Sequence, residues 1–82
     1  MAKREVWSVR WDKSSRWWHV VDHLRNVIYS YRVKAVAVST AASECRGVWE
    51  GGGNLAQLRV FNKNGRIAFE RTYGKDPRRT KG

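Results

Sequence analysis

Apolar and polar residues alternate along the first part of the chain. In the stretch VWSVRW, at residues 6–11, Trp7 lies on one side of the alternation and Arg10 on the other. A period of two is typical of a strand with one buried face. Residues 17–21 are rich in aromatic and β-branched residues, and the polar segment DKSS separates the two runs. We therefore predict a β-hairpin over residues 6–21.

The alternation resumes at residues 27–33, which predicts a third strand, and the period changes at Lys34. Beyond that point the apolar positions follow helical spacing: Val38, Ala41, Ala42, Cys45 and Trp49. Three glycines at residues 51–53 provide an end for the helix, because glycine accepts the left-handed conformation that a helix C-terminus needs. We predict a helix over residues 34–50. A single continuous strand over residues 27–40 is the competing interpretation.

The last part of the chain has the pattern of a second hairpin. Strand-like segments at residues 58–61 and 66–73 flank an Asn-Gly pair at residues 64–65, which is the strongest short hairpin signal. The sequence thus predicts a single α+β domain over residues 1–74, followed by a basic tail over residues 75–82 without apolar residues. The expected fold is one antiparallel sheet of four or five strands with one helix on one face, in the order β-β-β-α-β-β.

The closing segment NKNGRIAFERTYGKDP resembles domain of unknown function 2188, a family of small bacterial and phage proteins. Members of that family end in a hairpin with a Gly-Arg-Ile step, then Tyr-Gly and Asp-Pro, which correspond here to residues 65–67, 73–74 and 76–77. The alanine-patterned helix is also similar, and the resemblance extends from Trp17 to Pro77. It implies a fold, a small antiparallel sheet with one helix packed on it, but no activity.

Basic residues strongly outnumber acidic ones. The chain of 82 residues has 17 Lys and Arg residues against 7 Asp and Glu residues, which gives a net charge of +10. Such a charge attracts polyanions, of which nucleic acid is the most common and an anionic membrane surface the second. It also suits an acidic protein surface. The charge therefore predicts a partner class but not a single partner.

Cysteine content and hydropathy indicate the expected location. Cys45 is the single cysteine, so an internal disulfide is excluded, and we expect a small buried side chain in a reduced, cytoplasmic setting. No apolar run approaches the roughly 20 residues of a membrane span, and the first residues lack the apolar core of a secretory signal. We expect no membrane partner.

Residues that could support catalysis or metal binding do not form a motif. His19 and His23 are predicted on a strand and in the turn after it, without ligand-spaced Cys, Asp or Glu residues. The glycines at residues 51–53 follow no strand and precede no Lys-Ser or Lys-Thr pair, so they are not a phosphate loop. We expect a non-enzymatic protein with no metal and no cofactor.

One helix can cover only one face of the predicted sheet, so the two faces should differ. The side chains predicted to face the helix are apolar: Trp7, Val9, Trp11, Trp18, Val20, Leu58, Val60, Ile67 and Phe69. The side chains predicted for the opposite face are basic or aromatic: Arg10, Trp17, His19, Arg32, Arg59 and Phe61. Rings that stack on bases and guanidinium groups that neutralise phosphates are typical of single-strand binders. Terminal cations would extend the contact along a backbone: Lys3, Arg4, Lys75, Arg78, Arg79 and Lys81.

The leading prediction is therefore a small phage-encoded protein that binds DNA or RNA. Two alternatives remain open, because aromatic residues on a sheet belong to a core more often than to a binding face. The open face can instead bury itself against a second copy and form a homodimer. It can also dock on an acidic host protein, as a protein–protein interaction module. In each case we expect Trp7, Trp11 and Trp18 in the core and Trp17 on the outer face.

Overall fold

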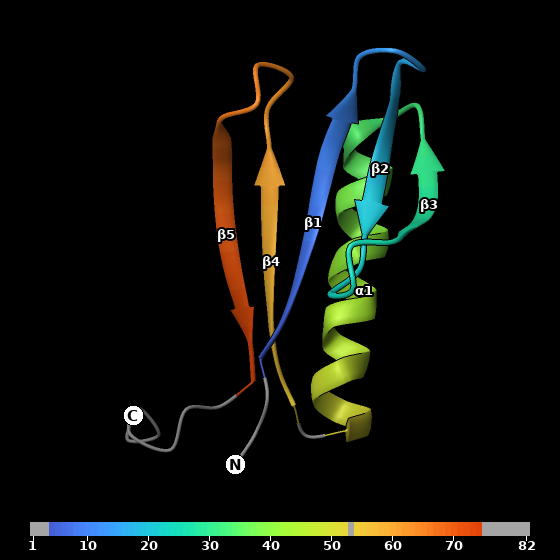
Figure 1. The fold of residues 1–82 in the computed structure, drawn as a ribbon. Coiled ribbons are helices and arrows are strands. Elements are labelled where there is room, and N and C mark those ends of the chain that lie inside the picture. Colours follow the sequence, from blue (N-terminus) through green and yellow to red (C-terminus); the bar gives the residue numbers. More distant parts are fainter. Residues whose placement is uncertain (1–3, 53, 75–82) are drawn as a thin grey trace.

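The computed structural model describes residues 4–52 and 54–74. Five strands and one helix follow one another in the predicted order (Figure 1): β1 (Arg4–Asp12), β2 (Trp17–Val21), β3 (Val27–Tyr31), α1 (Lys34–Gly52), β4 (Leu55–Phe61) and β5 (Ile67–Tyr73). The α+β class and the β-β-β-α-β-β order are thereby confirmed. The competing interpretation of a continuous strand over residues 27–40 is wrong, because α1 begins at Lys34.

The five strands form one sheet in the order β3-β2-β1-β4-β5, with β1 in the centre. Three of the four neighbouring strand pairs are antiparallel, but β1 and β4 pair parallel, from Arg4 opposite Leu55 to Val9 opposite Val60. The sheet is therefore mixed, and the prediction of a wholly antiparallel sheet is wrong at its central pair. The reason is the crossover: α1 returns the chain to the end at which β3 began, so β4 starts in the direction of β1.

The core lies between α1 and one face of the sheet, where alternate residues of β1, β2 and β4 are buried. Its members include two of the five tryptophans and three small helix residues: Trp7, Val9, Trp18, Val20, Ala37, Ala41, Cys45, Ala56, Leu58 and Val60. Burial raises the pKa of the Cys45 thiol to about 12, so this side chain stays protonated and apolar in the core. The small side chains at spacings of four residues allow α1 to lie close to the sheet.

The helix covers this face unevenly (Figure 1). It packs on β4, β1 and β2, and Tyr29 of β3 donates a hydrogen bond from its hydroxyl to Glu44 Oε2 at 3.3 Å. By contrast, β5 lies at the far edge of the sheet and barely contacts α1. Phe69 sits on the helix-facing side, opposite Val60, yet it remains 37% exposed. The helix is too narrow to reach all five strands, and this leaves β5 uncovered.

Two predicted core residues are therefore misassigned. Phe69 lies on the helix-facing side as predicted but is not buried in the core, and Ile67 is 47% exposed and pairs with Phe61 after a register shift. That shift changes the alternation at the end of the last hairpin, so a simple period of two fails there. Trp11 is half-buried and packs against Trp18, with ring centroids 5.1 Å apart. It belongs to the edge of the core.

Candidate functional site

The sheet face opposite α1 carries the basic and aromatic residues that the sequence assigns to it. Arg10 of β1 pairs with His19 of β2, and Arg59 of β4 lies opposite Ser8 of β1. Each of these residues alternates with a buried neighbour that faces the helix. Since side chains along a strand point to opposite faces in turn, they all project from the uncovered face. We call this the open face.

Two aromatic rings on the open face are each paired with a guanidinium group. The Arg10 guanidinium carbon lies 4.2 Å from the centroid of the Phe61 ring, and that of Arg32 lies 5.2 Å from the Trp17 ring. Both arginines are exposed while both rings are half-buried. The outermost planar group at each place is therefore a guanidinium. Such a plane can stack on a base and also attract a phosphate.

His19 is fixed on the open face by both nitrogens of its ring. Nδ1 lies 2.7 Å from Ser30 Oγ, and Nε2 lies 3.1 Å from Asp12 Oδ2. Asp12 also accepts hydrogen bonds from the Ser15 hydroxyl at 2.8 Å and from the Ser14 amide at 3.1 Å. The Ser15 hydroxyl foremost, and then His19, hold the pKa of Asp12 below its ordinary value. Because both ring nitrogens have partners, His19 links β2 to β3 and to the turn that follows β1.

Arg59 differs from the other two arginines because a carboxylate compensates its charge. Its Nε lies 3.1 Å from Glu70 Oε2, and Gln57 donates a hydrogen bond from Nε2 to Glu70 Oε1 at 3.2 Å. A phosphate on Arg59 would have to compete with Glu70. Arg10 and Arg32 are not in an ion pair with any described residue. Their charges are therefore more available to an anion than that of Arg59.

A hollow of about 610 Å³ on the open face adds a residue that the sequence patterns missed. It is bordered by Arg10, Arg59 and Phe61 and by the turn between β2 and β3, from which Arg25 reaches its rim. Arg25 adopts a left-handed conformation with φ of 69°. The sequence shows only that the polar segment DHLRN contains a cation. Because this segment is a turn, strand alternation does not predict which way the Arg25 side chain points.

The side chain of Asp22 stabilises the turn between β2 and β3. Asp22 Oδ1 accepts hydrogen bonds from the backbone amides of Leu24 and Asn26, both at 2.9 Å. His23 Nδ1 lies 3.3 Å from Glu5 Oε1. The Arg25 amide donates a hydrogen bond to the Asp22 carbonyl oxygen at 3.0 Å, and in a three-residue hairpin loop the residue that closes such a turn is left-handed, which explains the conformation of Arg25. The turn thus presents a guanidinium beside the strands rather than away from them.

Six other predicted cations fall in terminal segments. Arg4 is the first residue of β1. The others lie outside the described residues: Lys3, Lys75, Arg78, Arg79 and Lys81. Among the described residues, the basic and aromatic side chains of the open face include Arg10, Trp17, His19, Arg25, Arg32, Arg59 and Phe61.

Neither a cluster of metal ligands nor a membrane-spanning helix occurs in the described parts of the chain. Across residues 4–52 and 54–74, no group of three His, Cys, Asp or Glu side chains is arranged to hold a metal ion. Over the same ranges, no helix combines the length and the apolar character needed to cross a bilayer. What the open face offers is planar groups and positive charge.

The resemblance to domain of unknown function 2188 stays a prediction from the sequence. No protein-family model, no curated protein and no solved structure matches this chain.

Proposed function

We propose that this protein is a non-enzymatic binder of single-stranded nucleic acid and that it uses the open face. The observation that carries the proposal is the pair of arginine–aromatic contacts, Arg10 with Phe61 and Arg32 with Trp17. Both lie on one face of a sheet, and the net charge of the chain is +10. Stacking planes with adjacent cations are the combination that single-strand binders use.

A single strand fits the open face better than a duplex does. Bases of a single strand are unstacked and can lie on a ring or a guanidinium plane, whereas a duplex hides them. A sheet surface also lacks the protruding helix with which many proteins read a major groove. Arg25 at the rim of the hollow supplies a further cation for the backbone. The proposal extends to a cytoplasmic location and a phage origin, which rest on the sequence.

Binding to a labelled single strand of about 12 nucleotides tests the proposal, since a single-strand site spans about 4–16 nucleotides. Fluorescence anisotropy is measured for the wild type and for Arg10→Ala with Arg32→Ala over a range of salt concentrations. The control is Arg46→Ala with Arg71→Ala, which removes the same charge on the other side of the sheet. A duplex of equal length serves as the second ligand.

The open-face variant should bind more weakly than the control variant, to all sequences alike. Its salt slope should fall by about 0.7 for each phosphate contact that is lost on a single strand. The duplex should bind less tightly than the single strand. Equal losses in both variants would assign the binding to net charge alone. No binding by the wild type at about 150 mM salt would refute the proposal.

A further inference from the structure

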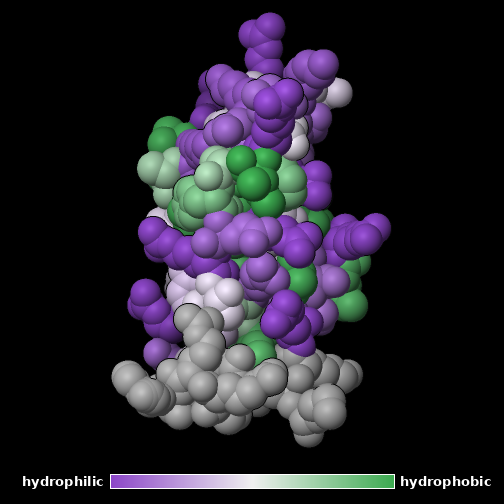
Figure 2. Space-filling model, turned by 90° about the vertical axis from the view of Figure 1, so that its left-hand side faces the viewer, coloured by the Kyte–Doolittle hydropathy of each residue, from purple (hydrophilic) through white to green (hydrophobic). Residues whose placement is uncertain are grey.

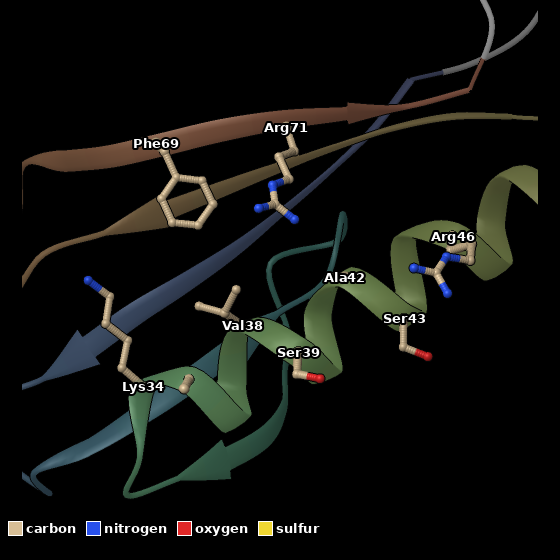
Figure 3. Close-up of a pocket in the computed structure, with 9 residues that line it drawn as sticks. Lys34, Val38, Ser39, Ala42, Ser43, Arg46, Phe69 and Arg71 are labelled. Atoms are coloured by element: carbon tan, nitrogen blue, oxygen red, sulfur yellow. The ribbon is translucent and has the colours of Figure 1, made fainter.

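A second candidate site lies on the other side of the sheet, between α1 and the uncovered strand β5. There an open groove of about 830 Å³ runs along the helix. It exists because α1 packs on β4, β1 and β2 and stops short of β5. In Figure 3, Phe69 and Arg71 extend from β5 toward the helix, and Lys34 and Val38 extend from the helix toward them. We call this the helix–strand groove.

The floor of the helix–strand groove is apolar. Val38 and Ala42 contribute small aliphatic side chains from the helix, and the ring of Phe69 contributes from the strand. Ser39 and Ser43 are exposed and short, so they leave the groove open along the helix. Figure 2 shows a hydrophobic band across the β5 edge between hydrophilic side chains. An apolar groove of this kind has the character of the surfaces on which an amphipathic helix lays its apolar face.

The rim of the groove is positive. The charged residues that line it are Lys34, Arg46 and Arg71, and no Asp or Glu lines it among the described residues. Lys34 donates a hydrogen bond to the neutral Asn62 Oδ1 at 3.1 Å, so its charge is not compensated by that contact. The helix between Lys34 and Arg46 is about 18 Å long, which is the length of about three helical turns.

We propose that the helix–strand groove binds an acidic amphipathic helix of a partner protein. The apolar stripe of that helix would lie on Val38 and Phe69, and its carboxylates would pair with Lys34, Arg46 and Arg71. A helix in an apolar groove is a common way to recognise a peptide, and a basic rim selects an acidic one. A second copy of this chain is disfavoured, since each copy carries a net charge of +10. This inference does not rest on the function proposed for the open face.

The test uses a designed peptide of about 14 residues, long enough for the groove. Its leucines follow helical spacing and its other positions are mainly glutamate. One control peptide has the same composition in an order that breaks the apolar stripe, and another has lysine in place of glutamate. Anisotropy gives the affinity for the full chain. Nuclear magnetic resonance of the ¹⁵N-labelled chain then locates the peptide.

Two pairs of variants make the test specific. Ser39→Trp and Ser43→Trp each fill the groove from an exposed position, so the fold should survive. Arg46→Glu with Arg71→Glu reverses two charges of the rim, and Arg10→Glu with Arg32→Glu reverses the same number on the open face. The acidic amphipathic peptide should shift amides of α1 and β5. Reversal of the two rim charges should lower the affinity for this peptide by about tenfold or more, and reversal of the two open-face charges should lower it much less.

Any one of the following results would overturn the inference. The acidic peptide fails to bind saturably at up to about 1 mM. The peptide without an apolar stripe binds as tightly, or the two charge reversals weaken binding equally, which reduces the contact to net charge. A single-stranded oligonucleotide shifts the groove amides, which makes the groove a nucleic-acid site. Alternatively, the wild type sediments as a dimer and Ser43→Trp as a monomer, which makes a second copy the occupant.

Discussion

Arg10 on β1 holds its guanidinium carbon 4.2 Å from the centre of the Phe61 ring on the neighbouring strand β4. The parallel pairing of β1 and β4 brings these two residues together, although nearly the whole fold separates them along the chain. The contact places a planar cation above a ring on the open face. It is the local arrangement on which the proposed stacking of a base depends.

Removal of the Phe61 ring should therefore weaken binding to a single strand more than it weakens the fold. Phe61→Leu keeps most of the apolar volume, and its stability cost should stay below about 1.5 kcal/mol. Binding should lose up to about 1–3 kcal/mol, the range for one base on one aromatic ring. Phe69→Leu, on the other side of the sheet, is the matched control and should bind normally. Equal affinities for the two variants would exclude Phe61 as a stacking residue.

Trp18 and Phe69 should differ widely in their contribution to stability. Trp18 is 4% exposed within the core, so Trp18→Ala should cost about 3–5 kcal/mol and unfold much of the protein. Phe69 is 37% exposed at the edge of the sheet, and Phe69→Ala should cost only about 1 kcal/mol. Urea unfolding followed by circular dichroism measures both. A loss of cooperative folding in Phe69→Ala would show that α1 covers β5 after all.

Gly74 and Gly47 should respond in opposite ways to replacement by alanine. Gly74 has a φ of 120°, and a Cβ atom there would meet Leu55 Cδ2 at 2.6 Å and Trp49 Cε3 at 3.0 Å. Gly74→Ala should lower the melting temperature because strain and overlap both oppose it. Gly47 lies within α1, and its Cβ atom would meet nothing within 4 Å. Gly47→Ala should stabilise the fold by about 0.5–1 kcal/mol. A higher melting temperature for Gly74→Ala would contradict this description of the closing segment.

Asp12 makes the fold sensitive to acid. Its hydrogen bonds with Ser15, His19 and Ser14 lower its pKa in the folded protein below the ordinary value of 3.8. A carboxyl group of this kind stabilises the fold above its unfolded pKa, and this stabilisation disappears as the pH falls through the folded pKa. The difference in melting temperature between the wild type and Asp12→Asn should therefore persist above pH 3.8 and shrink as the pH falls below it. A difference that does not change with pH would mean that the charge of Asp12 is irrelevant.

Local periodicity predicts much of the fold. The alternation in β1 and β2 assigns Trp7 and Trp18 to the core and Arg10 to the open face, because strand geometry fixes which side chains share a face. The change of period at Lys34 likewise gives the start of α1 correctly.

The errors have non-local causes. The parallel pairing of β1 with β4 depends on where the crossover delivers the chain, and a local pattern does not contain that information. Phe69 alternates like a core residue, but its exposure depends on how far α1 extends across the sheet. Arg25 was missed because it belongs to a turn, where hydrogen bonds of Asp22 rather than periodicity set the direction of the side chain.

The indole N–H signals of Trp17 and Trp18 provide the most direct measurement of the central claim. These residues are adjacent in β2 but project from opposite faces, with Trp18 in the core and Trp17 beside Arg32 on the open face. A single-stranded oligonucleotide is titrated into the ¹⁵N-labelled protein at about 150 mM salt. The account predicts a saturable shift of the Trp17 indole signal while that of Trp18 stays in place. Saturable binding that leaves Trp17 unmoved would contradict it, and so would the absence of any binding.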